Sequence, residues 1–350
     1  MRRNKRLRWA AACAALLLLC FALCGCTAQS VPIGRRAMVR LIYLETAGDG
    51  YRALTVVCDF GTGEESAGAA TVQTAQAPTL SQALQQAAGA QGGSPFFAQN
   101  RLLLLGPKLA RTHLRQTLEF FAQNSGAYRD PAVWLWRQGE EALLRQEDPM
   151  AIVRQAESLT AQNAEGCALH VLETDPQADC VVVPVLRLRA AADDSGCLLE
   201  AAGLGVFAAD EQQLYTDPET LQGYGLLRGR RKSLTLAVEC GGRKIAVQLE
   251  GLTRHLTAQQ GMLTLQCGGT ANAAAQGEPL PPPAALQTAV ERQVTELCTV
   301  AWQRLTQEGR RDALYLEWWA QQLGTAAQPL AVQVSIRLNA APFPADPAEA

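Results

Sequence analysis

The hydrophobic positions of this chain form one unbroken run near its start and then recur with the periods of strands and helices. The run extends from Trp9 to Leu23, about 15 residues, which is shorter than the roughly 20 that a spanning helix needs. After Cys26 no run of comparable length occurs. The rest of the chain is therefore expected to form a folded body without a further membrane span.

The first part of this body has the pattern of a hairpin, a loop and a helix. Alternation predicts a strand over Ala37–Glu45, and Gly48-Asp49-Gly50 predicts a tight turn before an antiparallel strand over Tyr51–Phe60. The small polar residues of Gly61–Gln76 predict a loop. A helix is predicted from Thr79, which opens a capping box, to Gly89.

Short apolar runs then alternate with helical patterns. Arg101–Leu105 and Val133–Trp136 have the length and composition of strands that are buried on both faces. A helical stripe from Leu109 to Phe121 lies between them, and Asp148-Pro149 opens a further helix before a strand over Cys180–Arg189. Strands separated by helices are predicted to pair in parallel through crossover connections.

The pattern changes to strand and turn after the Asp- and Gly-containing segment Asp193–Gly196. Strands are predicted over Leu198–Phe207, Lys232–Glu239, Lys244–Leu252 and Met262–Cys267. Gly241-Gly242 predicts a hairpin turn, and Asp217-Pro218 predicts the start of a short helix. The Ala-, Gly- and Pro-rich segment Gly268–Pro283 predicts a linker or an exposed loop.

The longest helical pattern covers Ala284–Glu308, and Asp312–Leu323 extends or restarts it. Its apolar face consists of Leu286, Val290, Val294, Leu297, Ala301 and Leu305. A face of this length must cover something, so we predict that the helix lies across a mostly antiparallel sheet, which the alternating strand Ala331–Leu338 joins. The alternative is an arm that docks on a partner subunit and is exposed in the isolated protein.

These elements predict an α+β or mixed α/β fold with more than one domain. An N-terminal mixed α/β region is expected over residues 37–190, and whether it forms one or two subdomains is left open. A C-terminal α/β domain with the long helix is expected over residues 191–340, followed by a disordered tail at residues 341–350.

The charges around the first apolar run identify it as a secretory leader. Five Arg and Lys residues precede the run, and Leu23-Cys24-Gly25-Cys26 ends it. This ending resembles a lipobox, in which Cys26 receives a diacylglyceryl group and becomes the new N-terminus. It predicts a signal peptide over residues 1–25 and a lipidated tether over residues 26–36. The alternative is an uncleaved N-terminal anchor, and in both cases the body is tethered outside a membrane.

Charge and cysteine content narrow the class of protein. The formal charge of the whole chain is −2 and the leader carries only positive charges, so the body is mildly acidic, which argues against nucleic acid as a partner. The cysteines beyond Cys26 are odd in number and form no C-x-x-C pair. They are predicted to be small buried hydrophobes, with one disulfide pair left open. They are Cys58, Cys167, Cys180, Cys197, Cys240, Cys267 and Cys298.

No group of residues has the spacing of a catalytic or metal site. His113, His170 and His255 are the only histidines, none has a second ligand at metal-binding spacing, and His255 is interpreted as part of a surface turn. Hydrolase, zinc-protease and Walker A motifs do not occur. We therefore predict no catalytic residue, cofactor or metal, and a protein that is not an enzyme.

For two kinds of residue pair, acidic and tryptophan pairs, we weigh a structural interpretation against a functional one. Glu140-Glu141 and Asp193-Asp194 are interpreted as solvent-facing or helix-compensating acids. Trp134 and Trp136 are interpreted as core residues, with the floor of a ligand site as the alternative. For Trp318 and Trp319 we expect one buried and one exposed ring, and a groove or a membrane contact is the alternative.

The order of these segments resembles the Ger(x)C family, the lipoprotein C subunits of bacterial spore germinant receptors. The resemblance is carried by Gly48-Asp49-Gly50-Tyr51, by the blocks PTLSQALQQ, PFFAQNRLLLLGPKLAR, LRQTLEFFAQ and AYRDPAVWLWRQGEEAL, by Gly203–Phe207 with Leu221–Leu227, and by RRDALYLEWW. Thr27-Ala28 after Cys26 departs from the Trp-Asp that family members often carry there.

The resemblance implies a three-part mixed α/β lipoprotein, anchored through Cys26 to the outer face of the spore's inner membrane. It implies integral membrane A and B subunits as partners, and a non-enzymatic role in nutrient-triggered germination. One alternative is a solute-binding lipoprotein of a transporter, which should show two lobes of repeated strand–helix units. Another is a cell-envelope hydrolase, which the missing nucleophile–base set disfavours.

Overall fold

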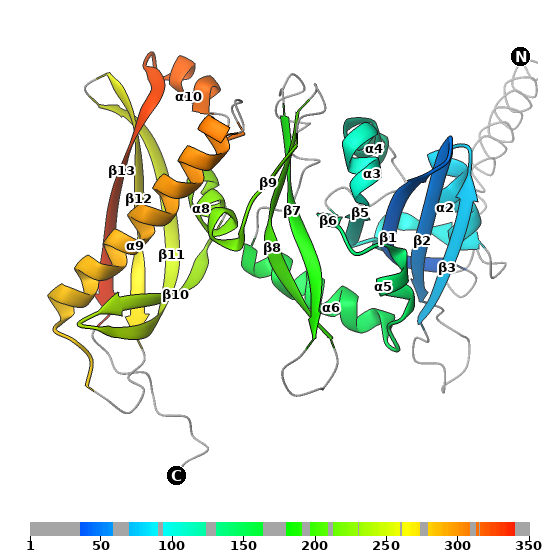
Figure 1. Cartoon of the computed structure of the whole chain (residues 1–350), viewed down its shortest axis with the longest axis horizontal. Helices are drawn as coiled ribbons and strands as arrows, with labels where there is room; N and C mark the ends of the chain where they lie inside the picture. Colours follow the sequence, from blue (N-terminus) through cyan, green and yellow to red (C-terminus); the bar gives the residue numbers. More distant parts are fainter. Residues whose placement is uncertain are drawn as a thin grey trace, which may run out of the picture.

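The described part of the chain forms a row of blocks, seen from right to left in Figure 1: a sheet with helices on both faces, a long hairpin that continues this sheet, and a second sheet crossed by one long helix. This computed structural model describes residues 36–58, 70–89, 94–123, 131–163, 180–190, 197–208, 213–229, 231–259, 261–273, 279–308, 313–314 and 316–339. The predicted signal peptide, Cys26, the turn at Asp193–Gly196 and the predicted tail lie outside these residues.

Within these residues the first sheet has nine strands, in the order β3-β2-β1-β5-β6-β7-β8-β9, with β4 paired to β1. The strands are β1 (Arg36–Ala47), β2 (Gly50–Cys58), β3 (Ala70–Ala77), β4 (Ser94–Phe96), β5 (Leu102–Leu105), β6 (Ala132–Trp136), β7 (Cys180–Ala190), β8 (Cys197–Ala208) and β9 (Gln213–Tyr215). β1 and β2 form the predicted hairpin, in which Gly48 has a φ of 58°. The chain then pairs β1, β5, β6 and β7 in parallel, as predicted.

Helices cover both faces of this sheet. The helices α2 (Leu80–Gly89), α3 (Pro107–Thr112) and α4 (Leu114–Gln123) lie on one face, and α5 (Glu140–Leu144) and α6 (Pro149–Asn163) lie on the other. The predicted cap of α2 is present, because the backbone N–H of Gln82 donates to Thr79 Oγ1 over 3.3 Å. All four leucines of β5 are completely buried, which explains the uninterrupted apolar run in the sequence.

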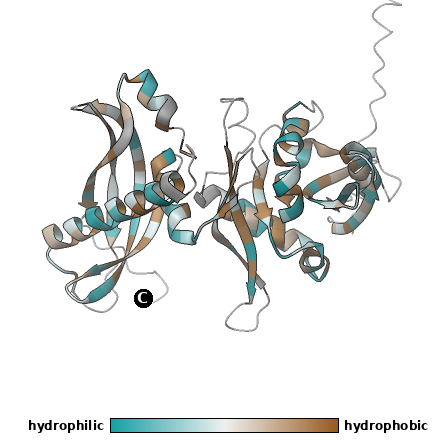
Figure 2. Ribbon diagram, turned by 45° about the horizontal axis from the view of Figure 1, so that its top comes forward, coloured by the Kyte–Doolittle hydropathy of each residue, from teal (hydrophilic) through white to brown (hydrophobic). Residues whose placement is uncertain are grey.

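The β7–β8 hairpin contributes side chains to two hydrophobic cores. Val181, Val183 and Phe207 pack in the core of the first sheet, on the side of α2, α3 and α4, whereas Val182 and Leu204 pack in the core of the second sheet. Figure 2 accordingly shows strong hydrophobic colouring along both strands. Alternate residues on a strand point to opposite faces of the sheet, so this hairpin lies between the two cores and contributes side chains to both.

In the described residues the second sheet has four strands, in the order β10-β11-β12-β13. They are β10 (Ser233–Cys240), β11 (Arg243–Gln259), β12 (Met262–Ala273) and β13 (Ala326–Asn339). The first three pair antiparallel, β10 and β11 are joined by the predicted Gly241-Gly242 turn, and β13 joins β12 in parallel. The helix α9 (Pro283–Gln303), which continues into a π-helical turn (Arg304–Glu308), crosses this sheet in Figure 1, and α10 (Leu316–Gln322) precedes β13.

The apolar face of α9 is buried against this sheet and against α8 (Pro218–Arg228). All six residues of the predicted face are at most 4% exposed. The helix α8 begins as predicted at Asp217, whose Oδ1 accepts from the backbone N–H of Thr220 over 2.8 Å. The two helices approach closely at Gly223, where a Cβ atom would lie only 2.1 Å from the carbonyl oxygen of Leu297.

Three sequence predictions are wrong in part. The predicted loop Gly61–Gln76 contains the edge strand β3, whose mostly half-exposed positions left little hydrophobic alternation to detect. The predicted linker Gly268–Pro283 begins inside β12, where Gly269 lies against the backbone of β11 at an irregularity in the pairing. The stripe from Leu109 to Phe121 belongs to two helices, which are separated at His113.

The predicted domain boundary between residues 190 and 191 stays a proposal. In the structure β8 follows this boundary along the chain and pairs with β7 over its whole length. Strands β8 and β9 are thus part of the first sheet, and the second sheet begins at Ser233.

Candidate functional site

Some of the candidate residues named in the sequence analysis lie outside the part of the chain that the structure describes. Cys26, His170 and Asp193-Asp194 lie outside the described residues, and of Trp318 only the backbone is described. Lipidation at Cys26 therefore stays a prediction.

Trp134 and Trp136 are core residues of β6. Their exposures are 1% and 0%, and both indole N–H groups have partners inside the protein. Trp134 Nε1 donates to Thr160 Oγ1 over 3.1 Å, and Trp136 Nε1 donates to the carbonyl oxygen of Gly139 over 2.7 Å. Because neither ring faces an open surface and neither donor is free, the core interpretation is confirmed.

Polar side chains meet at the carboxyl ends of the parallel strands, where open α/β sheets usually bind ligands. Glu45 lies near the end of β1, and its Oε1 accepts from the backbone N–H groups of Leu109 and Thr46 over 2.7 and 2.8 Å. The carboxylate thus satisfies a free N–H at the start of α3 and complements the helix dipole. Gly106 leaves room for it, since a Cβ atom there would lie 2.2 Å from Glu45 Oε2.

The same edge holds Tyr43 and an ion pair. Arg52 Nη1 donates to Glu140 Oε1 over 2.5 Å. Burial of Tyr43, followed by the charges of Glu45 and Glu140, raises the pKa of its phenol, which therefore stays protonated at neutral pH. Glu140 and Glu141 form the first turn of α5, which agrees with their interpretation as helix-compensating acids. Each carboxylate of this cluster is used to hold an element in place.

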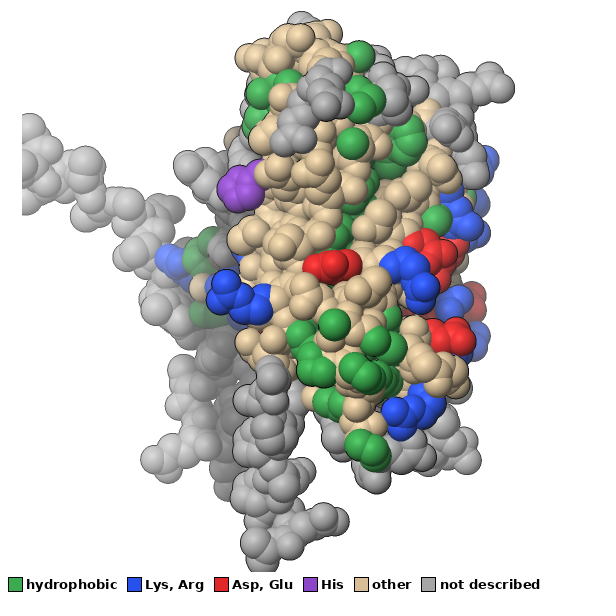
Figure 3. Space-filling model, turned by 90° about the vertical axis from the view of Figure 1, so that its left-hand side faces the viewer, with side chains coloured by type: hydrophobic (Ala, Val, Ile, Leu, Met, Phe, Trp, Pro, Cys, Tyr) green, Lys and Arg blue, Asp and Glu red, His purple; other side chains and the backbone are tan. Residues whose placement is uncertain are grey.

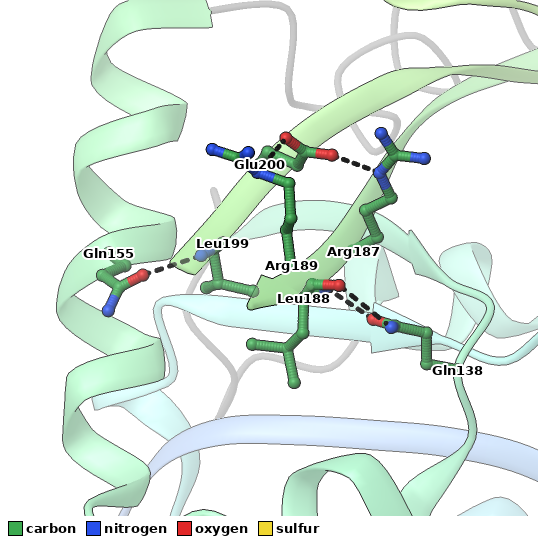
Figure 4. A network of polar contacts seen from close by, with 7 residues as sticks. All are labelled: Gln138, Gln155, Arg187, Leu188, Arg189, Leu199 and Glu200. Carbon is green, nitrogen blue, oxygen red and sulfur yellow. Dashed lines mark hydrogen bonds and ion pairs between the residues drawn. The ribbon is translucent and has the colours of Figure 1, made fainter. Parts of the chain in front are cut away.

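Two glutamine side chains replace missing backbone partners beside the β7–β8 hairpin (Figure 4). The β6–β7 pairing is only two residues long. Beyond it Gln138 continues the ladder, because its Nε2 donates to the carbonyl oxygen of Leu188 over 3.1 Å and its Oε1 accepts from the same residue's N–H over 2.5 Å. On β8 the N–H of Leu199 donates to Gln155 Oε1 of α6 over 2.8 Å. The amides attach the hairpin to the first block.

An ion triad lies on the same two strands in Figure 4. Glu200 of β8 forms ion pairs with Arg187 and Arg189 of β7. The distance from Arg189 Nε to Glu200 Oε2 is 3.3 Å. The arginine side chains are more than half exposed, so solvent screens the pairs and their contribution to stability is small. The triad is a surface feature of the hairpin.

The described histidines and Trp319 have structural surroundings. The His113 ring packs edge-on against Tyr51, with ring centres 5.7 Å apart. The prediction of a surface turn for His255 is wrong, because it lies within β11, opposite Gln266, although it is exposed. Trp319 is 36% exposed, and the Arg254 guanidinium lies 5.9 Å from its ring centre.

Figure 3 shows the side of the molecule formed by the second sheet. Uncharged polar side chains and backbone dominate it, hydrophobic side chains gather at its two ends, and charges of both signs lie mostly toward one margin. Among the side chains drawn in colour there is no broad patch of one sign.

The described residues hold no group of three or more His, Cys, Asp or Glu side chains that is suited to a metal ion. A search of the same residues finds no helix long and apolar enough to cross a membrane.

Comparison with known proteins identifies the N-terminal part of the chain. Residues 29–164 match the family model described as the spore germination protein N-terminal domain. These residues include β1 to β6 and all of α6. No curated protein matches the sequence closely enough to count as a relative.

Two solved structures were found as matches to this chain. A crystal structure of the GerBC protein has 11% sequence identity and a TM-score of 0.48, with 85% of this chain and 96% of that chain covered. A structure of Era with MgGDPNP and a segment of 16S ribosomal RNA has 11% identity and a TM-score of 0.14, with 70% and 67% covered. Both TM-scores are too low for a functional argument.

Residues 29–164 are thus similar to the N-terminal domain of spore germination proteins. The resemblance to the Ger(x)C family, predicted from the sequence, is confirmed.

Proposed function

We propose that this protein is the non-enzymatic lipoprotein C subunit of a spore nutrient germinant receptor. The observation that carries the proposal is the match of residues 29–164 to the N-terminal domain of spore germination proteins. The polar groups of the described residues support it, since those at the carboxyl edge of the first sheet cap a helix or form ion pairs. Because these polar groups have structural roles, we infer that the multi-domain body acts by presenting surfaces to partner proteins.

The anchor belongs to the same proposal. Cys26 stands ten residues before Arg36, where β1 begins. Ten extended residues reach roughly 35 Å, so a lipid on Cys26 would hold the first block close to the membrane surface. Two acyl chains of a diacylglyceryl group suffice for stable anchoring. We place the protein on the outer face of the spore's inner membrane, beside the membrane-spanning A and B subunits.

The topology argues against the solute-binding alternative. Such proteins have two lobes that repeat the same strand–helix units. Here the first sheet contains the parallel run β1, β5, β6 and β7, whereas the second pairs three strands antiparallel under one helix. The two blocks do not repeat one another.

Co-purification from spore membranes tests this proposal. A tagged chain, solubilised in mild detergent, should retain the A and B subunits. Spores that lack the chain should fail to germinate on a nutrient to which wild-type spores respond. A tagged unrelated spore lipoprotein is the control for non-specific retention. Recovery of a permease and an ATPase in place of the A and B subunits would favour the transporter.

A further inference from the structure

Two exposed apolar side chains lie together at α10 and the residue that follows it. Trp319 is 36% exposed and Leu323 is 37% exposed. The backbone N–H of Leu323 donates to the carbonyl oxygen of Trp319 over 3.0 Å, so the two residues are one helical turn apart. Leu316 and Ala320 of the same helix are each only 2% exposed. The fold thus buries one side of α10 and leaves an apolar pair outside.

A cationic side chain lies beside this pair. The guanidinium of Arg254, from β11, is 5.9 Å from the ring centre of Trp319. Its alkyl part passes over the end of α8, since a Cβ atom at Gly229 would lie 2.6 Å from Arg254 Cδ. Arg228, the residue before Gly229, adds a second cation and donates to the carbonyl oxygen of Leu314 over 3.4 Å. Figure 1 shows α10 at the upper end of the second block.

The charge of Arg254 is poorly compensated within the protein. No carboxylate of the described residues forms an ion pair with it, and its buried Nε has no hydrogen-bond partner there. Burial, followed by the charge of Arg228, lowers the pKa of Arg254 to about 10, so it is still charged at neutral pH. Such a charge costs free energy, which a bound anion would offset. The surroundings of Arg254 therefore favour an anion.

The apolar pair and the cation together suit the headgroup layer of a membrane. Tryptophan prefers the boundary between lipid and water, where its ring and its N–H are both satisfied. Arginine pairs with phosphate groups, and anionic lipids attract basic residues. A free anion would satisfy Arg254 but not Trp319 and Leu323, and a purely apolar partner would do the reverse. A phospholipid satisfies all three.

We propose that Trp319, Leu323 and Arg254 form a second membrane contact of this protein, which binds an anionic phospholipid surface. Arg254 pairs with a lipid phosphate, and the two apolar side chains enter the boundary between headgroups and acyl chains. The proposal rests on the proposed function for one point, the tether at Cys26 that keeps the body at the membrane.

The tether makes a weak contact sufficient, because it gives this surface a high effective concentration of lipid. One attachment precedes the first block and the other belongs to the second block. Together they limit the rotation of the body on the membrane and so fix which faces point toward membrane-spanning partners.

Fluorescence quenching by brominated lipid tests the contact on the full-length, anchored protein. The protein is reconstituted into vesicles of phosphatidylglycerol and phosphatidylcholine with brominated acyl chains, which quench tryptophans in the bilayer. Trp134 and Trp136 are at most 1% exposed and give a constant background. We expect the wild type to be quenched and Trp319→Phe to lose most of that quenching. Equal quenching of the two proteins, or none in the wild type, would overturn the proposal.

Variants of the other two residues provide a second readout. Arg254→Gln and Leu323→Ser should each reduce the quenching of Trp319 several-fold, whereas Arg254→Lys should keep most of it. Leu144→Ser is the matched control, because Leu144 is an exposed leucine of α5, in the first block, and its loss should change nothing.

Lipid charge gives a test that needs no variant. Quenching of the wild type should be stronger on vesicles with phosphatidylglycerol than on phosphatidylcholine alone, and salt should weaken it. Equal quenching on both lipids at all salt concentrations would overturn the proposal even if Arg254→Gln does not fold.

Other ligands of this surface give different results. Inorganic phosphate that changes the emission of Trp319, without quenching by brominated lipid, would show a site for a free anion and overturn the proposal. Protection of Trp319 from a soluble quencher in spore membranes, but not in vesicles, would show a protein partner and would also overturn it.

A fatty-acid label on the same sample separates this inference from the proposed function. A labelled chain whose Trp319 is not quenched overturns the second contact and leaves the lipoprotein proposal intact. An unlabelled chain whose Trp319 is quenched supports the contact and contradicts the anchor. An unlabelled chain without quenching overturns both.

Discussion

Glu45 illustrates how single residues hold this protein together. It lies near the end of a parallel strand, where a functional acid would be expected, and its oxygens are hydrogen-bonded to backbone N–H groups of its own strand and of α3. Gly106 beside it is required because any side chain would collide with the carboxylate. The local roles of such polar residues are decided by the backbone groups around them.

Removing this cap should weaken the protein. Glu45→Ala leaves the N–H of Leu109 without its acceptor and should lower the free energy of unfolding by about 1–2 kcal/mol, the usual cost of losing a helix cap. Glu45→Gln keeps an oxygen acceptor and should cost less than half as much. Urea unfolding of both variants gives these values, and equal losses would show that the charge, and not the hydrogen bond, is what matters.

Asp148 should make stability depend on acid pH. A hydrogen bond from Arg154, followed by backbone N–H groups at the start of α6, lowers its pKa below the usual 3.8. A lowered folded-state pKa gives stability that is present above the unfolded value and lost as the pH falls through the folded one. Asp148→Asn should therefore be less stable than the wild type at neutral pH, by an amount that shrinks at acid pH. A difference in urea midpoint that stays constant down to the acid limit of folding would contradict this.

We predict that membrane attachment depends on Cys26. Cys26→Ala should abolish labelling with a palmitate analogue and leave the precursor uncleaved, since only a thiol accepts the diacylglyceryl group. Cys24→Ala is the matched control and should be labelled and processed normally. Label retained on Cys26→Ala would refute the lipobox interpretation.

At the scale of elements, α9 shows what an amphipathic pattern establishes. The spacing of its apolar residues predicts a helix with one buried face but leaves open whether the fold or a partner covers that face. The structure places the second sheet and α8 against it. The glycine at position 223 permits the close approach of α8, a contact that the hydrophobic pattern does not reveal.

A buried charge on α9 distinguishes a core helix from a docking arm. Val294 is 0% exposed, so Val294→Asp should cost several kcal/mol, because an unpaired carboxylate would be buried. Ala285→Asp places the same group on an exposed position of this helix and should be nearly neutral. Melting temperatures of the two variants give the comparison. An unchanged melting temperature for Val294→Asp, with failed receptor assembly, would favour the arm.

At the scale of the whole molecule, the β7–β8 hairpin couples the two blocks. Neighbouring residues of β7 enter different cores, and the glutamines of Figure 4 attach the hairpin to the first block. We therefore expect the described body to unfold as one cooperative unit.

Hydrogen exchange in urea measures this coupling. Amides of β5 and of β11 should lose protection at the same urea concentration. Val182→Ala and Val183→Ala, which lie on opposite faces of β7, should each cost about 2 kcal/mol and lower the midpoint of both sheets. Two separate midpoints, with each variant affecting only one sheet, would show independent domains and would support a boundary near residue 190.

The sequence predicted most local structure and the family, because both depend on patterns within short segments. The capped helix at Thr79, the buried leucines of β5 and the N-cap at Asp217 each have their determinants within a few residues. The edge strand β3 was missed because half-exposed strand residues carry little hydrophobic alternation. The break at His113 was missed because the apolar stripe is continuous across it.

By itself, then, the sequence determined most of the elements and the resemblance to Ger(x)C proteins, whereas the leader with Cys26 stays a prediction. Only the tertiary structure decided which elements share a sheet and that Glu45 reaches α3. Hydrophobic spacing reports that a residue is buried but not which partner buries it. That choice depends on contacts between residues far apart in the chain, whose energy no local pattern encodes.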